Sequence, residues 1–284
     1  MSPTEAALSE AAPAKVNLAL HVTGVLPDGR HALDSLVCFA GACDVLRADE
    51  AERLTLAVEG PEADGAPTQD NLVMRAARML SPERGARLTL VKALPSAAGI
   101  GGGSSDAAAA LRLLSRLWDL PLPEPGATDA LGSDVPVCLH PAPTRMRGAG
   151  ERLEPVSLPA LALLLVNPRV AVPTGTVFAR LRSRENPPLE APPGGDLADL
   201  ADWLARQRND LAAPAIAAAP VIADVLDMLA GLPGALAHGM SGSGATCWAI
   251  YPGLDQAEFA AMTLRRRRPD WWVSASWADH ARAG

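Results

Sequence analysis

The chain has 284 residues, a formal net charge of −7 and a pI near 5.3, with 49% hydrophobic and 20% charged residues. This length allows a sizeable core and more than one domain, and the acidic balance argues against binding to nucleic acid. The longest apolar run, Leu158 to Val166, is too short to span a bilayer, so we expect no membrane partner.

Cysteine usage and the start of the chain bear on the compartment. The four cysteines form neither a C-x-x-C pair nor a zinc-ligand spacing. In a chain of this length we expect them to be reduced thiols in the core rather than disulfides. The first twelve residues hold no apolar run of the kind that a secretory signal needs. We therefore expect a cytoplasmic protein. The cysteines are Cys38, Cys43, Cys138 and Cys247.

Hydrophobic periodicity and turn residues predict the elements in chain order. The first are strands over 14–23, 36–47 and 53–59, with a Pro-Asp-Gly turn between the first two, and a helix over 71–80. Next come a strand over 87–92, a helix that ends near Trp118, a helical turn over 128–131 and a strand over 135–139. The last are a buried strand within 158–166, a Pro-rich loop over 186–195, helices over 196–207 and 220–230, and strands over 245–251 and 271–277.

Residues 95–105 form the most informative segment, because four of the five residues from Gly99 to Gly103 are glycine. A backbone without side chains can approach a ligand closely with its N–H groups exposed. The apolar residues that follow fall on one helical face, which predicts Ser104 or Ser105 as the helix N-cap and Asp106 in the first turn. A strand, a glycine loop and a helix N-terminus together predict an anion site, and the natural anion is phosphate.

The spacing in this loop separates it from two common phosphate motifs. The dinucleotide fingerprint G-x-G-x-x-G needs a glycine where this chain has Ser104, and the P-loop needs a lysine after Gly103 that is absent here. We therefore interpret the segment as a third kind of phosphate loop. The alternative, a flexible glycine turn, agrees poorly with the serines and the amphipathic helix that follow.

Lysine is rare in this chain. Among 25 basic residues only Lys15 and Lys92 are lysine, and all the others are arginine. A lysine that is kept against such a skew is a candidate for chemistry that needs a compact charge rather than a planar guanidinium. Lys92 lies three residues before the loop, and Lys15 lies in the strand predicted over 14–23. The alternative is that two lysines remained by chance.

The chain resembles the GHMP kinases. The resemblance rests on the loop Gly-Gly-Gly-Ser-Ser-Asp-Ala-Ala and on further blocks that follow the family's order from residue 13 to about residue 250. The Pro-Asp-Gly-x-His block narrows it to members that act on an alcohol linked to cytidine diphosphate. The further blocks are Ala14-Lys15-Val16-Asn17-Leu18, Pro27-Asp28-Gly29-Arg30-His31, Asp70-Asn71-Leu72-Val73, Gly132-Ser133-Asp134-Val135-Pro136, Asn209-Asp210-Leu211 and Met240-Ser241-Gly242-Ser243-Gly244-Ala245-Thr246.

The resemblance implies an α/β (α+β) fold of two domains, with the active site in the cleft between them. We expect the boundary near Gly148–Gly150, which gives an N-terminal domain over 1–149 and a C-terminal domain over 150–284. The N-terminal domain would carry the phosphate loop and the catalytic lysine and aspartate. The protein is expected to be a monomer or a weak homodimer.

The resemblance also implies a kinase that transfers the γ-phosphate of ATP to an alcohol, with ATP and Mg²⁺ as cofactors. Asp134 would orient or deprotonate the acceptor hydroxyl, and Lys15 would lower the pKa of Asp134 and neutralise charge at the γ-phosphate. Asn71 and Lys92 would lie near the adenine or ribose. No carboxylate cluster marks a metal site, so ATP, water and serine hydroxyls would hold the metal. The residues expected to hold the phosphates are Pro95, Ser96, Ala97, Ala98, Gly99, Ile100, Gly101, Gly102, Gly103, Ser104 and Ser105.

The implied acceptor is the 2-hydroxyl of a methylerythritol linked to cytidine diphosphate, an intermediate on the non-mevalonate route to isoprenoid precursors. Asn17 and His31 would contact it, with His31 facing the cytosine. Phe178 would be one aromatic wall of the base pocket, with Thr174 near that wall. The chain departs from the family where Arg30 takes the place of a tyrosine that would be the second wall. A guanidinium can also stack on a base.

Other interpretations stay open from the residues alone. Asp134 is also explained as a turn cap, Lys92 as a strand-end charge and Asn71 as a helix N-cap, and Phe178 is also explained as a core residue. For the whole chain, the alternatives are a GHMP kinase for homoserine or mevalonate, and a nucleotide-binding protein without catalysis. A dinucleotide-dependent oxidoreductase is disfavoured by the loop spacing.

Overall fold

The computed structural model describes residues 8–65 and 70–278. These residues form two compact units, each built from segments that are separate in the sequence. Unit 1 comprises the described parts of 8–13, 43–96 and 102–140, and unit 2 comprises 14–42, 97–101 and 141–278. The chain passes from one unit to the other within strands β1 (Leu8–Val25) and β2 (His31–Glu50), and again on each side of residues 97–101. The predicted boundary at residue 149 concerns the family's two domains and stays a prediction.

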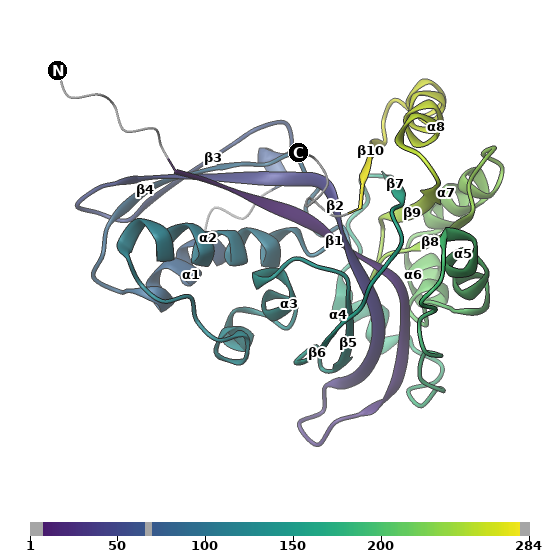
Figure 1. The fold of residues 1–284 in the computed structure, drawn as a ribbon, viewed down its shortest axis with the longest axis horizontal. Coiled ribbons are helices and arrows are strands. Elements are labelled where there is room, and N and C mark those ends of the chain that lie inside the picture. Colours follow the sequence, from purple (N-terminus) through teal and green to yellow (C-terminus); the bar gives the residue numbers. More distant parts are fainter. Residues whose placement is uncertain (1–7, 66–69, 279–284) are drawn as a thin grey trace. The chain divides into compact units, whose positions relative to one another are not determined.

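Unit 1 combines sheet strands with three α-helices and two 3₁₀ helices. Strand β4 (Ala86–Val91) pairs antiparallel with the last part of β2 and parallel with β3 (Thr55–Glu59). The alternation in β4 buries Ala86, Leu88 and Leu90 on one face. Helices α1 and α2 pack against each other on the same side of β3 and β4 (Figure 1), and α3 packs against α2. The helices are η1 (Ala63–Gly65), α1 (Leu72–Leu80), α2 (Gly102–Trp118), η2 (Pro125–Leu131) and α3 (Val135–Leu139).

Unit 2 contains an antiparallel sheet of order β10-β7-β9-β8. Every residue of β7 is buried, and α6, α7 and α8 supply apolar side chains to the same core. The first part of β2 pairs with β5, which forms a hairpin with β6 around Gly148–Gly150. The elements are β5 (Thr144–Gly148), β6 (Arg152–Pro155), β7 (Ala162–Asn167), α4 (Thr174–Ala179), α5 (Leu197–Arg206), α6 (Ala212–Ala218), α7 (Val221–Ala230), β8 (Ala237–Met240), β9 (Cys247–Tyr251), α8 (Leu254–Arg267) and β10 (Trp272–Trp277).

Most predicted elements are confirmed, but the strand expected over 135–139 is wrong. These residues form helix α3, and all five are buried. Pro136 lies in the first turn of this helix, where its missing N–H costs nothing and its fixed φ is suitable. A short, fully apolar run has no periodicity that distinguishes a buried strand from a buried helix. The patterns also did not indicate β5, β6, α4, α6 or β8, which have seven residues or fewer, nor the 14-residue helix α8.

The predicted start of α2 is also wrong. The helix begins at Gly102, so Ser104 and Ser105 lie inside it and Asp106 lies beyond its first turn. The hydroxyl of Ser105 is buried and donates to the carbonyl of Pro13 at 2.8 Å. Asp106 instead forms a buried ion pair with Lys92. Glycine has a low helix propensity, so the start of the helix at Gly102 was not expected from the residues alone.

The cysteine expectation is confirmed within the described residues. None of the four cysteines forms a disulfide among the described residues; three are buried and Cys43 is half-buried. Burial raises the pKa of the Cys247 thiol, which keeps it protonated. Among the residues that the structure describes, none belongs to a helix that is both long and apolar enough to cross a membrane.

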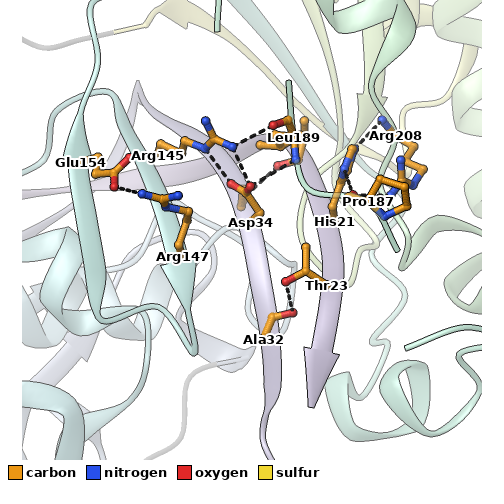
Figure 2. Close-up of polar contacts among 12 residues, drawn as sticks. His21, Thr23, Ala32, Asp34, Arg145, Arg147, Glu154, Pro187, Leu189 and Arg208 are labelled. Atoms are coloured by element: carbon orange, nitrogen blue, oxygen red, sulfur yellow. Dashed lines mark hydrogen bonds and ion pairs between the residues drawn. The ribbon is translucent and has the colours of Figure 1, made fainter. Parts of the chain in front are cut away.

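A buried ion pair fixes the Pro-rich loop of unit 2 to its strands. Asp34 of β2 accepts two hydrogen bonds from the guanidinium of Arg145 on β5, at 2.8 and 2.7 Å (Figure 2). The same carboxylate accepts the N–H of Leu189 at 3.1 Å, and Arg145 donates to the carbonyl of Leu189 at 2.8 Å. The Asp34 side chain is 3% exposed, so this charge depends on Arg145 for its compensation.

We expect Asp34→Ala to destabilise unit 2 strongly. The substitution leaves the Arg145 guanidinium buried without its carboxylate, which costs about 3–5 kcal/mol. The matched control is Asp49→Ala, which removes an exposed carboxylate from the pair with Arg87 on the same strand β2 and should cost less than about 1 kcal/mol. Denaturant unfolding of both variants measures the difference. Equal costs for the two substitutions would contradict the assignment.

Candidate active site

The first half of the glycine loop is packed against the glycine motif at 240–246. Gly99 has φ +72°, and a Cβ atom there would lie 2.6 Å from the carbonyl oxygen of Ser241 and 2.7 Å from that of Gly244. Both the backbone conformation and the close approach therefore require glycine. The N–H of Thr246 donates to the carbonyl of Ala98 at 3.1 Å. This contact explains why the two glycine segments are both needed for one loop conformation.

Ser241 connects this loop to strand β1. Its hydroxyl donates its single proton to the carbonyl of Gly99 at 2.9 Å. The same oxygen accepts the N–H of Asn17 at 3.0 Å, and Ser241 is fully buried. Nearby, the N–H of Lys15 donates to the carbonyl of Ile100 at 2.9 Å. Strand β1, which carries Lys15 and Asn17, is thus bonded directly to residues 97–101 of the loop.

The amide of Asn17 has one defined orientation. Ser35 donates its hydroxyl proton to the carbonyl of Ala19 at 2.7 Å, so it can only accept from the Asn17 amide, at 2.7 Å. The NH₂ group of Asn17 is therefore used by Ser35. Its carbonyl oxygen is buried and has no hydrogen-bond partner among the described residues. Asn17 consequently has an acceptor oxygen that no described residue uses, while one of its two amide N–H groups is taken by Ser35.

The second half of the loop forms the N-terminus of α2 in unit 1. The hydroxyl of Ser104 lies 3.8 Å from the position that a Cβ atom would take at Gly132. Asp134 follows two residues later and immediately precedes α3, with φ −91° and ψ −11°. The structure therefore brings the helix end of the glycine loop together with the turn that carries Asp134. The loop and Asp134 were predicted separately, from residues that are about thirty positions apart.

Lys92 is buried beneath the start of α2, with an exposure of 4%. Its ammonium group contacts a carboxylate oxygen of Asp44, and one of Asp106 at 2.8 Å. Burial acts to lower the pKa of Lys92, but the two carboxylates outweigh it and raise that pKa. Asn71 caps α1, since its side-chain oxygen accepts the N–H of Val73 at 2.9 Å. These contacts give both residues structural partners, and their predicted places near adenine or ribose stay predictions.

His31 and Phe178 form a stacked pair in unit 2, with ring centroids 4.7 Å apart and an interplanar angle of 28°. The Nε2 atom of His31 is buried and has no partner among the described residues. Burial first, and the charge of Arg184 second, lower the pKa of His31, which favours the neutral ring. A flat surface with an unsatisfied ring nitrogen is suited to stacking and to one directed hydrogen bond.

Thr174 and Arg30 lie near Phe178 and His31 in the sequence, and each has a defined polar partner. Thr174 begins α4, and its hydroxyl lies 2.9 Å from that of Ser243 in the glycine motif. Arg30 lies at the tip of the β1–β2 hairpin, where its guanidinium pairs with Asp28 at 2.7 Å and is 55% exposed. The predicted Pro-Asp-Gly turn is confirmed by the N–H of Gly29, which donates to the carbonyl of Leu26 at 2.9 Å.

Comparisons with known proteins agree with the glycine segments and their order. The family description "GHMP kinases N terminal domain" matches residues 71–140, and "GHMP kinases C terminal" matches residues 187–269. The 4-diphosphocytidyl-2-C-methyl-D-erythritol kinase of Ruegeria pomeroyi is 54% identical over 274 residues, which cover 94% of this chain and 98% of that protein. The chain belongs to the GHMP kinase family.

Solved structures support the same fold for this GHMP kinase. A crystal structure of 4-(cytidine 5'-diphospho)-2C-methyl-D-erythritol kinase is 33% identical, with a TM-score of 0.75, and covers 95% of this chain and 98% of that one. A homoserine kinase from Cytophaga hutchinsonii, at 17% identity and a TM-score of 0.67, covers 98% of this chain and 96% of that one and shows the fold alone. The predicted two-domain α+β fold, the family and the phosphotransferase class are confirmed.

Sequence reasoning missed several residues that hold this site together. Asp44 carries a charge in the middle of an apolar strand and is fully buried, and this pattern is a signal that was available. Ser35 has no such signal, because serine is common in strands and turns alike, whereas Ser241 and Asn209 lie in the quoted family blocks but were given no role there. The side-chain amide of Asn209 donates to two carbonyls of the glycine motif, those of Met240 and Gly242, at 2.8 Å each.

A metal site was not predicted from carboxylates, and the described residues contain no group of three or more His, Cys, Asp or Glu side chains placed to hold a metal ion. A metal that enters this site with a nucleotide would take oxygen ligands from the phosphates and from water, as Mg²⁺ usually does.

We expect Gly99→Ala to impair both folding and nucleotide binding. The left-handed conformation alone costs an L-residue about 1–2 kcal/mol, and the added methyl group would overlap two carbonyl oxygens of the glycine motif. Thermal unfolding and calorimetric titration with an ATP analogue measure the two effects. The control is Gly194→Ala, where a Cβ atom meets nothing within 4 Å. Unchanged affinity in Gly99→Ala would show that the loop conformation is not needed for binding.

We expect the His31 ring to titrate below the ordinary histidine range, as followed by NMR. Because its pKa is lowered on folding, the unfolded chain binds more protons below about pH 6.5, and the free energy of unfolding falls as the pH drops through that range. Phe178→Ala uncovers the ring and should raise its pKa toward the ordinary value. Arg182→Gln is the control, since Arg182 is not among the groups that shift His31. A wild-type pKa at or above the ordinary value would contradict this.

Proposed function

We propose that this protein transfers the γ-phosphate of ATP to the 2-hydroxyl of 4-diphosphocytidyl-2-C-methyl-D-erythritol, in the non-mevalonate route to isoprenoid precursors. Relatives that are about half identical over nearly the whole chain carry the name of this kinase. The observation that carries the substrate assignment is the stacked pair His31 and Phe178, with its unsatisfied ring nitrogen. Such a pair suits a nucleobase.

The phosphate donor is ATP, held by residues 95–105. The N–H groups of the glycine loop and the N-terminus of α2 attract phosphate oxygens through partial positive charge. A loop can serve this way only when its backbone is fixed by other contacts. Ser241, Lys15 and Thr246 supply those contacts through the carbonyls of residues 98–100, which leaves the N–H groups of the glycines for the ligand.

Asp134 is the group that orients the acceptor hydroxyl and takes its proton. It lies beside the helix end of the phosphate loop, at a turn that fixes its backbone before α3. Lys15 supplies positive charge to the transferred phosphoryl group, where charge spreads over three oxygens in the transition state. Its backbone bond to Ile100 keeps strand β1 and the loop in register.

The acceptor is bound through complementary hydrogen-bonding groups. Asn17 has a carbonyl oxygen without a partner among the described residues, and in this proposal that oxygen accepts a hydrogen bond from a hydroxyl of the methylerythritol. His31 faces the cytosine with its Nε2 atom, and Phe178 and Thr174 line the wall of the base pocket. Arg30, held by Asp28, borders the pocket in the position of the family's tyrosine.

Mg²⁺ accompanies ATP, and when bound it neutralises negative charge on the phosphates. The described residues fit a metal that ATP and water carry into the site, because they contain no cluster of three or more His, Cys, Asp or Glu side chains that could hold it. We further propose a cytoplasmic monomer or weak homodimer that binds neither nucleic acid nor membrane. The four free cysteines are typical of a reducing compartment.

A homoserine- or mevalonate-type kinase is a weaker candidate. Structures with those names resemble this chain at 17% identity or less, which supports the fold and not the substrate. Neither homoserine nor mevalonate contains a base to stack on His31 and Phe178. A catalytically silent protein is also disfavoured, since Lys15 and Asp134 are both present.

The decisive experiment is ATP consumption with Mg²⁺ and each of three acceptors: 4-diphosphocytidyl-2-C-methyl-D-erythritol, homoserine and mevalonate. We expect turnover with the first alone. Asp134→Asn and Lys15→Met should each reduce the rate on the order of a hundredfold or more, because each removes a charge placed at the reacting groups. Asp129→Asn, an exposed carboxylate in η2, is the control. Turnover with another acceptor would reassign the substrate, and full activity in both variants would remove their roles.

A further inference from the structure

A group of three buried charged residues lies behind the phosphate loop in unit 1. Asp44 of β2 is fully buried, and Lys92 and Asp106 are each 4% exposed. The Lys92 ammonium contacts both carboxylates. Buried charges are costly unless they are paired, so a sequence keeps such a group only where its geometry is needed. The reaction as proposed above uses none of the three carboxylate and ammonium groups directly.

Asp44 fixes the entry to the loop. One of its oxygens accepts the N–H groups of Ala93 and Leu94, at 2.6 and 2.8 Å. These are the last two residues before Pro95, where the predicted phosphate-binding segment begins. The backbone of Lys92 is fixed as well, since its N–H donates to the carbonyl of Glu59 at 2.7 Å. These hydrogen bonds therefore fix the direction of the backbone where it enters the loop.

Asp106 fixes the exit from the loop. It lies on α2 four residues after Gly102, and one of its oxygens accepts from Lys92 at 2.8 Å. A Cβ atom at Gly102 would lie 3.7 Å from the Lys92 ammonium, which is therefore directly behind the first residue of the helix. Lys92 thus links the entry and exit of the same loop. Because the Lys92 side chain is only 4% exposed, its ammonium group contacts the two carboxylates rather than solvent.

We propose that Asp44, Lys92 and Asp106 act together as positioning residues that set the direction of the loop's N–H groups toward the nucleotide phosphates. The inference rests on the proposed function in taking ATP as the ligand of the loop. It gives Lys92 a role through the loop rather than through contact with adenine or ribose. It also explains the choice of lysine, since a compact ammonium fits between two carboxylates where a planar guanidinium does not.

The charge balance of the group indicates which substitution is informative. Two carboxylates face one ammonium, so removal of Asp106 leaves a neutral pair of Asp44 and Lys92 and no unpaired buried charge. Burial, opposed by Lys92 and reinforced by Asp44, raises the pKa of Asp106 to about 7. A neutral side chain is therefore tolerated at this position, and asparagine keeps the oxygen that accepts from Lys92.

The test compares Asp106→Ala with Asp106→Asn. In Asp106→Ala the start of α2 loses its bond to Lys92. We therefore expect the dissociation constant for ATP to rise about tenfold, which is comparable to the loss of one net hydrogen bond to a charged group. Asp106→Asn should restore most of the affinity, because it keeps the acceptor. The KM of the acceptor should stay within about twofold of wild type, because its proposed contacts lie in unit 2. The control is Asp49→Ala, an exposed carboxylate elsewhere on β2.

Calorimetric titration with ATP measures binding without turnover, so the two proposals fail in different ways. Absence of ATP binding to the wild-type protein would remove the proposed function itself. Wild-type ATP affinity in Asp106→Ala, or equal losses for ATP and the acceptor, would overturn the positioning role. Should Asp106→Ala not fold, Asp106→Glu keeps the charge but displaces the helix start by one methylene, and the same selective loss of ATP affinity is expected. Unchanged ATP affinity in that variant would equally overturn it.

Discussion

A loop that is to bind phosphate through its own N–H groups, as proposed for residues 95–105, must be fixed by contacts of its other groups. In this protein that constraint is met chiefly by the contact of Gly99 with the carbonyls of Ser241 and Gly244, which leaves no room for a side chain. The carbonyls of residues 98–100 accept hydrogen bonds from Thr246, Ser241 and Lys15. The carbonyl oxygens of residues 98–100 are thus bonded within the protein, whereas the N–H groups of the glycines stay available. An anion site needs such N–H donors.

The polar groups around the loop are arranged so that each donor has one possible partner. Ser241 and Ser35 each have a single proton, and each gives it to a backbone carbonyl. Both hydroxyls can then only accept, which fixes the backbone and the amide of Asn17. Because these groups are buried, a change in any one of them leaves another unsatisfied. The orientation of Asn17 toward a substrate is a consequence of this network.

The two ends of the loop are controlled by different physical means. Residues 97–101 are held by close backbone packing and neutral hydrogen bonds in unit 2, whereas residues 93–94 and the start of α2 are held by buried charges in unit 1. Glycine packing tolerates almost no change of shape, because a methyl group is already too large. A charged group tolerates changes of shape better but depends on its charge balance.

The sequence by itself determined most of the elements that are long and periodic, with α8 as an exception, and the motifs whose residues are adjacent in the chain. The strands over 14–23 and 36–47, the glycine loop and the family resemblance all came from local patterns, because periodicity and glycine spacing are local properties. The tertiary structure alone decided what depends on distant residues. The helix at 135–139, the start of α2 at Gly102, the burial of Lys92 between Asp44 and Asp106, and the stacking of His31 on Phe178 are of this kind. The ion pairs of Lys92 and the stacking of His31 require partners about ten to a hundred and fifty residues away, and single-sequence patterns carry no information on such partners.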